Sequence, residues 1–112
     1  MKALVTTLIA GAALVAGAAH ASKPGNAEAG KEKAQTCVAC HGQNGVSETP
    51  IYPILANQYR DYLVQALKGY RSGERNNAIM RGFASGLSDE DILDLALYFS
   101  EQSSRLRTPS VR

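Results

Sequence analysis

The sequence lacks tryptophan and has few strong metal-binding side chains, with two cysteines, two histidines and two methionines among its 112 residues. It also lacks a marked charge of either sign, since 12 lysines and arginines stand against 10 aspartates and glutamates. Proteins that bind nucleic acid usually carry a clustered basic face, so this balance argues against nucleic acid as a partner. No stretch of useful length alternates apolar and polar residues, as a half-buried strand does. We therefore expect an all-α protein.

The first residues have the pattern of an export signal. Lys2 supplies a short positive segment, residues 3–18 are small and apolar, and the sequence A-H-A at 19–21 is a cleavage site. The apolar run is shorter than the roughly 20 residues of a membrane span. We predict a cleaved signal peptide at 1–21, one domain at 22–112, a periplasmic location and no stable membrane insertion. An uncleaved N-terminal anchor is the alternative.

Removal of this segment leaves Cys37, Cys40, His41 and Met80 as the strong metal-binding side chains. Cys37-Val38-Ala39-Cys40-His41 is C-x-x-C-H, the attachment signature of a c-type haem. On a helical turn the two thiols can form thioethers to the haem vinyl groups, and the histidine can ligate the iron. We therefore predict one covalent haem c. A disulfide, a zinc site and a thioredoxin-like dithiol fit less well, because zinc usually takes four protein ligands and the dithiol a βαβ context.

Three helices are expected. The first begins after an N-cap at Asn26 and continues through the C-x-x-C-H motif to about Gly42. The second follows from apolar residues at three- and four-residue steps over 59–70, and Ser72-Gly73 ends it. The last begins at Ser88, which forms a capping box with Asp91.

Two stretches between these helices are expected to be loops. Residues 42–53 contain Gly45, Pro50 and Pro53, which favour turns over regular structure. Residues 74–86 are polar and contain glycine, and they carry Met80. This methionine is a candidate iron ligand, although a single methionine is also an ordinary core residue. Pro53 likewise is either a turn proline or a residue whose carbonyl orients His41.

At this point the chain resembles the class I cytochromes c over residues 27–102. It is similar to small single-haem bacterial members and to one half of the tandem di-haem cytochromes c. The matching segments are Cys37-Val38-Ala39-Cys40-His41-Gly42, Tyr52-Pro53-Ile54-Leu55-Ala56-Asn57-Gln58, Tyr62-Leu63, Gly73-Glu74-Arg75-Asn76-Asn77 leading to Met80, and Leu87-Ser88-Asp89 through Ala96-Leu97-Tyr98-Phe99.

The resemblance implies a class I cytochrome c fold. In it the N- and C-terminal helices cross, and a central helix and loops surround one covalent haem. Gly30 would allow the crossing, with Leu95 and Tyr98 packed on it. Such a helix glycine costs about 1 kcal/mol against alanine, which favours a packing role.

The resemblance also implies the site residues. Cys37 and Cys40 would hold the haem, His41 and Met80 would be the two axial ligands, and the carbonyl of Pro53 would accept the other ring N–H of His41. Tyr62 or Tyr70 could place a hydroxyl near the Met80 sulfur or a haem propionate, with packing on a helix face as the default. Four arginines could neutralise propionates, and the sequence does not choose among them: Arg60, Arg71, Arg75 and Arg81.

The function that the resemblance implies is electron transfer without catalysis. We expect a soluble, monomeric carrier that docks briefly with donor and acceptor redox proteins. One alternative is a haem subunit of a larger periplasmic dehydrogenase or oxidase complex. The other is a ligand-binding or peroxidatic haem protein, which would need an open sixth position on the iron.

Overall fold

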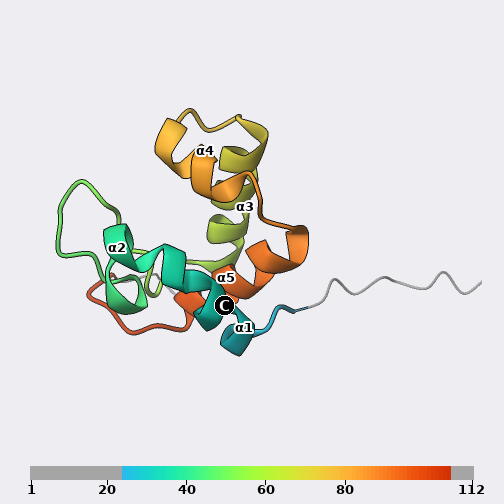
Figure 1. The fold of residues 1–112 in the computed structure, drawn as a ribbon. Coiled ribbons are helices and arrows are strands. Elements are labelled where there is room, and N and C mark those ends of the chain that lie inside the picture. The colour runs from blue at the N-terminus through green and yellow to red at the C-terminus, as the bar shows by residue number, and fades with distance from the viewer. Residues whose placement is uncertain (1–23, 107–112) are drawn as a thin grey trace, which may run out of the picture.

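The structure is a computed structural model that describes residues 24–106. These residues form helices and loops, with no β-strand among them (Figure 1). The predicted all-α class is therefore confirmed. The predicted signal peptide, 1–21, lies outside the described residues. In chain order the elements are α1 (Ala27–Lys33), η1 (Ala34–Thr36), α2 (Val38–His41), η2 (Gln43–Gly45), α3 (Arg60–Ser72), α4 (Ala78–Ala84) and α5 (Asp89–Ser100).

The first predicted helix begins as expected but is not continuous. The Asn26 side chain caps α1 by accepting the N–H groups of Glu28 and Ala29. The prediction of one helix over 27–42 is wrong, because α1 ends at Lys33 and a 3-10 turn separates it from α2. In that turn the Thr36 hydroxyl donates to the Lys33 carbonyl at 3.3 Å, which competes with regular α-helical bonding. The break makes α2 a short, separate turn that carries the C-x-x-C-H motif.

Helix α3 follows the predicted pattern, with Leu63, Ala66 and Gly69 buried. Gly73 ends it in the left-handed conformation, at a φ of +88°. The expectation of a loop over 74–86 is wrong, because residues 78–84 form α4. The Asn77 side chain caps α4 by accepting the N–H of Met80, which favours a helix here despite the polar neighbours.

In Figure 1, α4 lies against α3 at one end of the molecule and α1 lies at the other. Within the part of the chain that the structure describes, no helix is long and apolar enough to cross a membrane.

The predicted crossing of the terminal helices is present, between α1 and α5. A Cβ atom on Gly30 would overlap the Asp94 carbonyl oxygen and lie 2.8 Å from Cβ of Tyr98. Tyr98 is thus a neighbour of Gly30 as predicted, whereas the closest contact is with the backbone of Asp94 rather than with Leu95. Leu95 lies instead in the core, with Ala34 of the 3-10 turn and Leu63 of α3.

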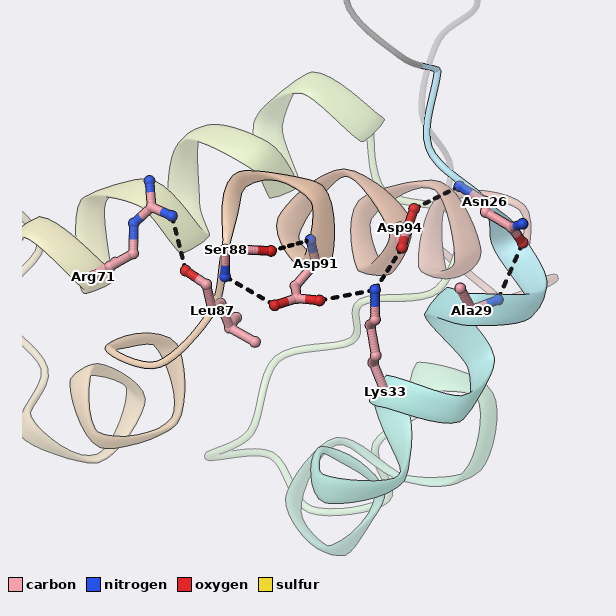
Figure 2. Close-up of polar contacts among 8 residues, drawn as sticks. All are labelled: Asn26, Ala29, Lys33, Arg71, Leu87, Ser88, Asp91 and Asp94. Atoms are coloured by element: carbon pink, nitrogen blue, oxygen red, sulfur yellow. Dashed lines mark hydrogen bonds and ion pairs between the residues drawn. The ribbon is translucent and has the colours of Figure 1, made fainter.

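A polar network also joins α1 to α5 (Figure 2). The Lys33 ammonium lies 2.8 Å from Asp91 Oδ1 and 2.6 Å from Asp94 Oδ2. The other oxygen of Asp94 accepts the backbone N–H of Asn26 at 2.7 Å, and the other oxygen of Asp91 accepts that of Ser88 at 2.9 Å. Lys33 is the main cause that lowers the pKa of Asp91 to about 2 and lowers the pKa of Asp94. The predicted capping box is therefore part of a larger clamp between the two helices.

Candidate haem-binding site

A mostly apolar cavity of about 370 Å³ lies among α2, α3, α4, α5 and the loop that precedes α3. Helix α3 contributes Leu63, Ala66 and Leu67, and α5 contributes Leu95 and Phe99. All seven side chains predicted as site residues line this one cavity. They are Cys37, Cys40, His41, Pro53, Tyr62, Tyr70 and Met80.

His41 is held in one orientation at the edge of this cavity. Its side chain is buried, with 6% of the residue exposed, and its Nδ1 lies 2.9 Å from the carbonyl oxygen of Pro53. A carbonyl can only accept, so Nδ1 carries the proton and donates. This bond selects the tautomer in which the lone pair of the neutral imidazole lies on the other ring nitrogen, Nε2, which is the form in which imidazole binds a metal.

The two cysteines lie on the same short turn as His41. Cys37 directly precedes α2, Cys40 lies within it, and both are free thiols that are partly buried. Burial raises the pKa of the Cys37 thiol, and a contact with the Thr36 hydroxyl opposes this shift. The short turn thus presents two thiols and an imidazole to one apolar space.

Met80 reaches the same cavity from α4. It is partly buried, and its backbone N–H is the one that Asn77 caps, at 3.0 Å. The sequence places Met80 in a loop, whereas the structure presents it from the first turn of a helix. Its thioether is a soft ligand of the kind that iron in a haem accepts.

Tyr62 and Tyr70 line the cavity together with a cation that the sequence could not single out. The guanidinium carbon of Arg75 lies 4.7 Å from the Tyr70 ring centroid and 5.7 Å from that of Tyr62. Arg75 Nη1 also donates to the Tyr62 hydroxyl at 3.4 Å, and this bond is the main cause that raises the pKa of Arg75. Arg71 instead donates to the Leu87 carbonyl and to Asp89. Of the four candidate arginines, Arg75 alone is among the residues that line the described cavity.

These residues fit a covalently attached haem. Its flat apolar ring suits a cavity walled by leucine, alanine and aromatic side chains. The two thiols and the imidazole share one helical turn, as thioether attachment with iron ligation requires. A thioether from another helix lines the same space, so both axial positions have a candidate ligand.

Comparison with known proteins places the chain in a family. The family model described as Cytochrome c matches residues 27–103. Cytochrome c-554(548) of Halomonas halodenitrificans is 52% identical over 81 residues, which cover 70% of this chain and 98% of that protein. Cytochrome c4 of Pseudomonas aeruginosa is 43% identical over 86 residues, covering 77% of this chain and 42% of its own length.

A solved structure supports the same relationship. The crystal structure of reduced recombinant cytochrome c4 from Pseudomonas stutzeri superposes with a TM-score of 0.67 at 40% identity, over 70% of this chain and 46% of that one. The chain therefore spans less than half of these two cytochromes c4, but nearly all of the Halomonas protein. The chain belongs to the cytochrome c family and has the class I cytochrome c fold.

Proposed function

We propose that this chain is a periplasmic electron carrier that moves one electron at a time through a single haem c. The family implies covalently bound haem c as the cofactor. When bound, the haem supplies an iron that alternates between the ferrous and ferric states. The single observation that carries the proposal is the convergence of Cys37, Cys40, His41 and Met80 on one apolar cavity.

In this proposal each of these residues has one task. Cys37 and Cys40 attach the ring, and His41 Nε2 binds the iron, since its Nδ1–H is directed to the Pro53 carbonyl. Met80 would supply the second protein ligand to the iron, and coordination by methionine and histidine would raise the reduction potential. With both His41 and Met80 as ligands, the iron would have no coordination site left for a substrate. This is the basis for proposing an electron carrier and not an enzyme.

We further propose how the protein reaches and meets its partners. A signal peptide at residues 1–21 would direct export and be removed before Ser22, leaving 22–112 as a single domain. The monomer would then dock transiently with donor and acceptor proteins through a small interface, as redox encounters do. N-terminal sequencing of the exported protein tests the cleavage position, with Ser22 as the expected first residue.

A potentiometric titration tests the proposed function. The protein is matured in the periplasm, and its absorbance is followed through reduction and reoxidation with mediators present. A reversible one-electron curve, with no change in the ferrous spectrum under carbon monoxide, supports a closed carrier. Carbon monoxide binding at near-stoichiometric amounts would instead favour a ligand-binding or peroxidatic protein. Purification in a stable assembly with another chain would favour a complex subunit over a free carrier.

A further inference from the structure

The helix that carries Met80 is short and turns most of its large apolar side chains toward the cavity. Ala84 is the buried residue of α4, and Ile79 and Phe83 line the cavity together with Met80. Figure 1 shows α4 set against α3, at the far end of the molecule from α1. Contacts made by the segment that precedes α4 therefore also bear on where its first turn, and with it Met80, lies.

Arg75 anchors the segment between α3 and α4. Its backbone N–H donates to the Gly69 carbonyl at 3.0 Å. Its side-chain methylenes cover Gly69 so closely that a Cβ there would lie 2.9 Å from Arg75 Cγ. Its guanidinium lies over the ring of Tyr70 and donates to the hydroxyl of Tyr62. Arg75 thus contacts three residues of α3 through its backbone and its side chain, namely Gly69, Tyr70 and Tyr62.

A short chain of hydrogen bonds connects this anchor to Met80. The Arg75 carbonyl accepts the N–H of Asn77 at 3.1 Å. The Asn77 side chain accepts the N–H of Met80 at 3.0 Å, and the Asn77 carbonyl accepts that of Arg81 at 2.9 Å. The N-cap of α4 is therefore two residues from the anchored guanidinium, and Met80 is three residues further on.

We propose that Arg75 is a positioning residue that, through its contacts with Tyr70 and Tyr62, fixes the start of α4 and so holds the Met80 sulfur in the cavity. This inference rests on the proposed function, in which Met80 is the sixth ligand. A guanidinium over an aromatic face is attracted by the ring quadrupole, and the neutral amide of glutamine lacks the charge on which this attraction depends. Loss of these contacts leaves the covalent haem and His41 in place but lets the α4 turn move away.

The test is competition for the iron by an added ligand. Ferric holoprotein is titrated with imidazole while the near-infrared sulfur-to-iron band is followed. Imidazole displaces Met80 more easily when the conformation that holds the Met80 sulfur in the cavity is less populated. The apparent affinity for imidazole therefore rises. For Arg75→Gln we expect the imidazole dissociation constant to fall by about three- to fivefold. This is the change in an equilibrium constant that follows from losing one partly exposed cation–π contact.

Variants of Tyr70 separate the stacking contact from other effects. Tyr70→Leu removes the ring and should reproduce the change, whereas Tyr70→Phe keeps the ring and should match wild type. The double variant Arg75→Gln/Tyr70→Leu should bind imidazole no more tightly than Arg75→Gln alone, because the two single substitutions remove the same contact between Arg75 and Tyr70. Arg81→Gln is the matched control, since it removes the same charge from an exposed residue of α4.

The outcomes distinguish this proposal from the one on which it rests. Wild-type protein without the sulfur band would show that Met80 is not a ligand, and would overturn both. A wild-type band with unchanged imidazole affinity in Arg75→Gln would overturn the positioning role alone. Equal increases in Arg75→Gln and Arg81→Gln would also overturn it, because charge and not the ring contact would then be the cause.

Discussion

Alanine in place of Gly30 tests the crossing of α1 and α5. The added Cβ would overlap the Asp94 carbonyl oxygen and lie 2.8 Å from Tyr98 Cβ. Both neighbours are fixed, one being backbone and the other the first side-chain atom, so no rotamer change can relieve the clash. The helices must therefore move apart, and the bonds that join Lys33 to Asp91 and Asp94 must stretch with them.

The expected magnitude is the difference between two effects. Alanine improves helix propensity by about 1 kcal/mol over glycine. Overpacking typically costs about 1–3 kcal/mol, and a clash with backbone belongs at the upper end of that range. The free energy of unfolding should fall by about 1–2 kcal/mol. For a domain of this size each kcal/mol shifts the melting temperature by about 4–8 °C, so we expect a decrease of about 5–15 °C.

Thermal unfolding of the holoprotein, followed by far-ultraviolet circular dichroism, measures this change. Gly82→Ala is the matched control, because Gly82 lies in α4 and a Cβ there meets nothing within 4 Å. That variant should melt at or above the wild-type temperature. A Gly30→Ala protein as stable as wild type, or as stable as Gly82→Ala, would refute the close helix crossing.

Three further predictions concern stability. Lys33→Gln should lower the free energy of unfolding more at pH 6 than at pH 2, because Lys33 lowers the folded-state pKa values of Asp91 and Asp94. The stability that these shifts contribute is complete above the ordinary carboxyl pKa and is lost as pH falls through about 2, the folded-state pKa of Asp91. Urea unfolding at both pH values measures the difference, and an equal loss at each contradicts it. Ser88→Ala should lower the free energy of unfolding by about 1 kcal/mol through loss of the N-cap, whereas Ser88→Thr should retain most of it. Gly73→Ala should lower the free energy of unfolding by about 1–2 kcal/mol, because Gly73 has a φ of +88° and alanine is strained in that conformation. An unchanged midpoint of urea unfolding would contradict this.

The helix boundaries that the sequence predicts correctly are those with local signals. Asn26, Ser88 and Asp91 cap helices through bonds to residues two or three positions away, so their effect is visible in a short window. The amphipathic repeat of α3 is local in the same sense. Haem attachment depends on five consecutive residues, and for this reason the motif could be interpreted without a structure.

The sequence does not predict helix α4, although it carries two weak signals there. Asn77 is a good N-cap, and Ile79 and Phe83 are four residues apart, as on one helix face. The helix has only seven residues, and Gly82 and the polar neighbours reduce its propensity. Short helices of this kind depend on tertiary contacts, here with α3, which the sequence does not display.

The Lys33 clamp and the Arg75 anchor could not be predicted, for a different reason. Lys33 and Asp94 are 61 residues apart and meet only because α1 and α5 cross at Gly30. In the sequence Arg75 is one of four equivalent candidates, and only the fold places it against Tyr62 and Tyr70. Interactions between distant residues follow from the geometry of the fold, which a single sequence does not supply.

The measurement that tests the central claim most directly is the absorption spectrum of the periplasmically matured protein, oxidised and reduced, for wild type and Met80→Ala. We predict a covalent haem c spectrum in both, with the weak near-infrared sulfur-to-ferric-iron band in wild type and its loss in the variant. A covalent haem without that band in wild type would contradict the His41/Met80 site. Failure to incorporate haem under conditions that mature other c-type cytochromes would contradict the account as a whole.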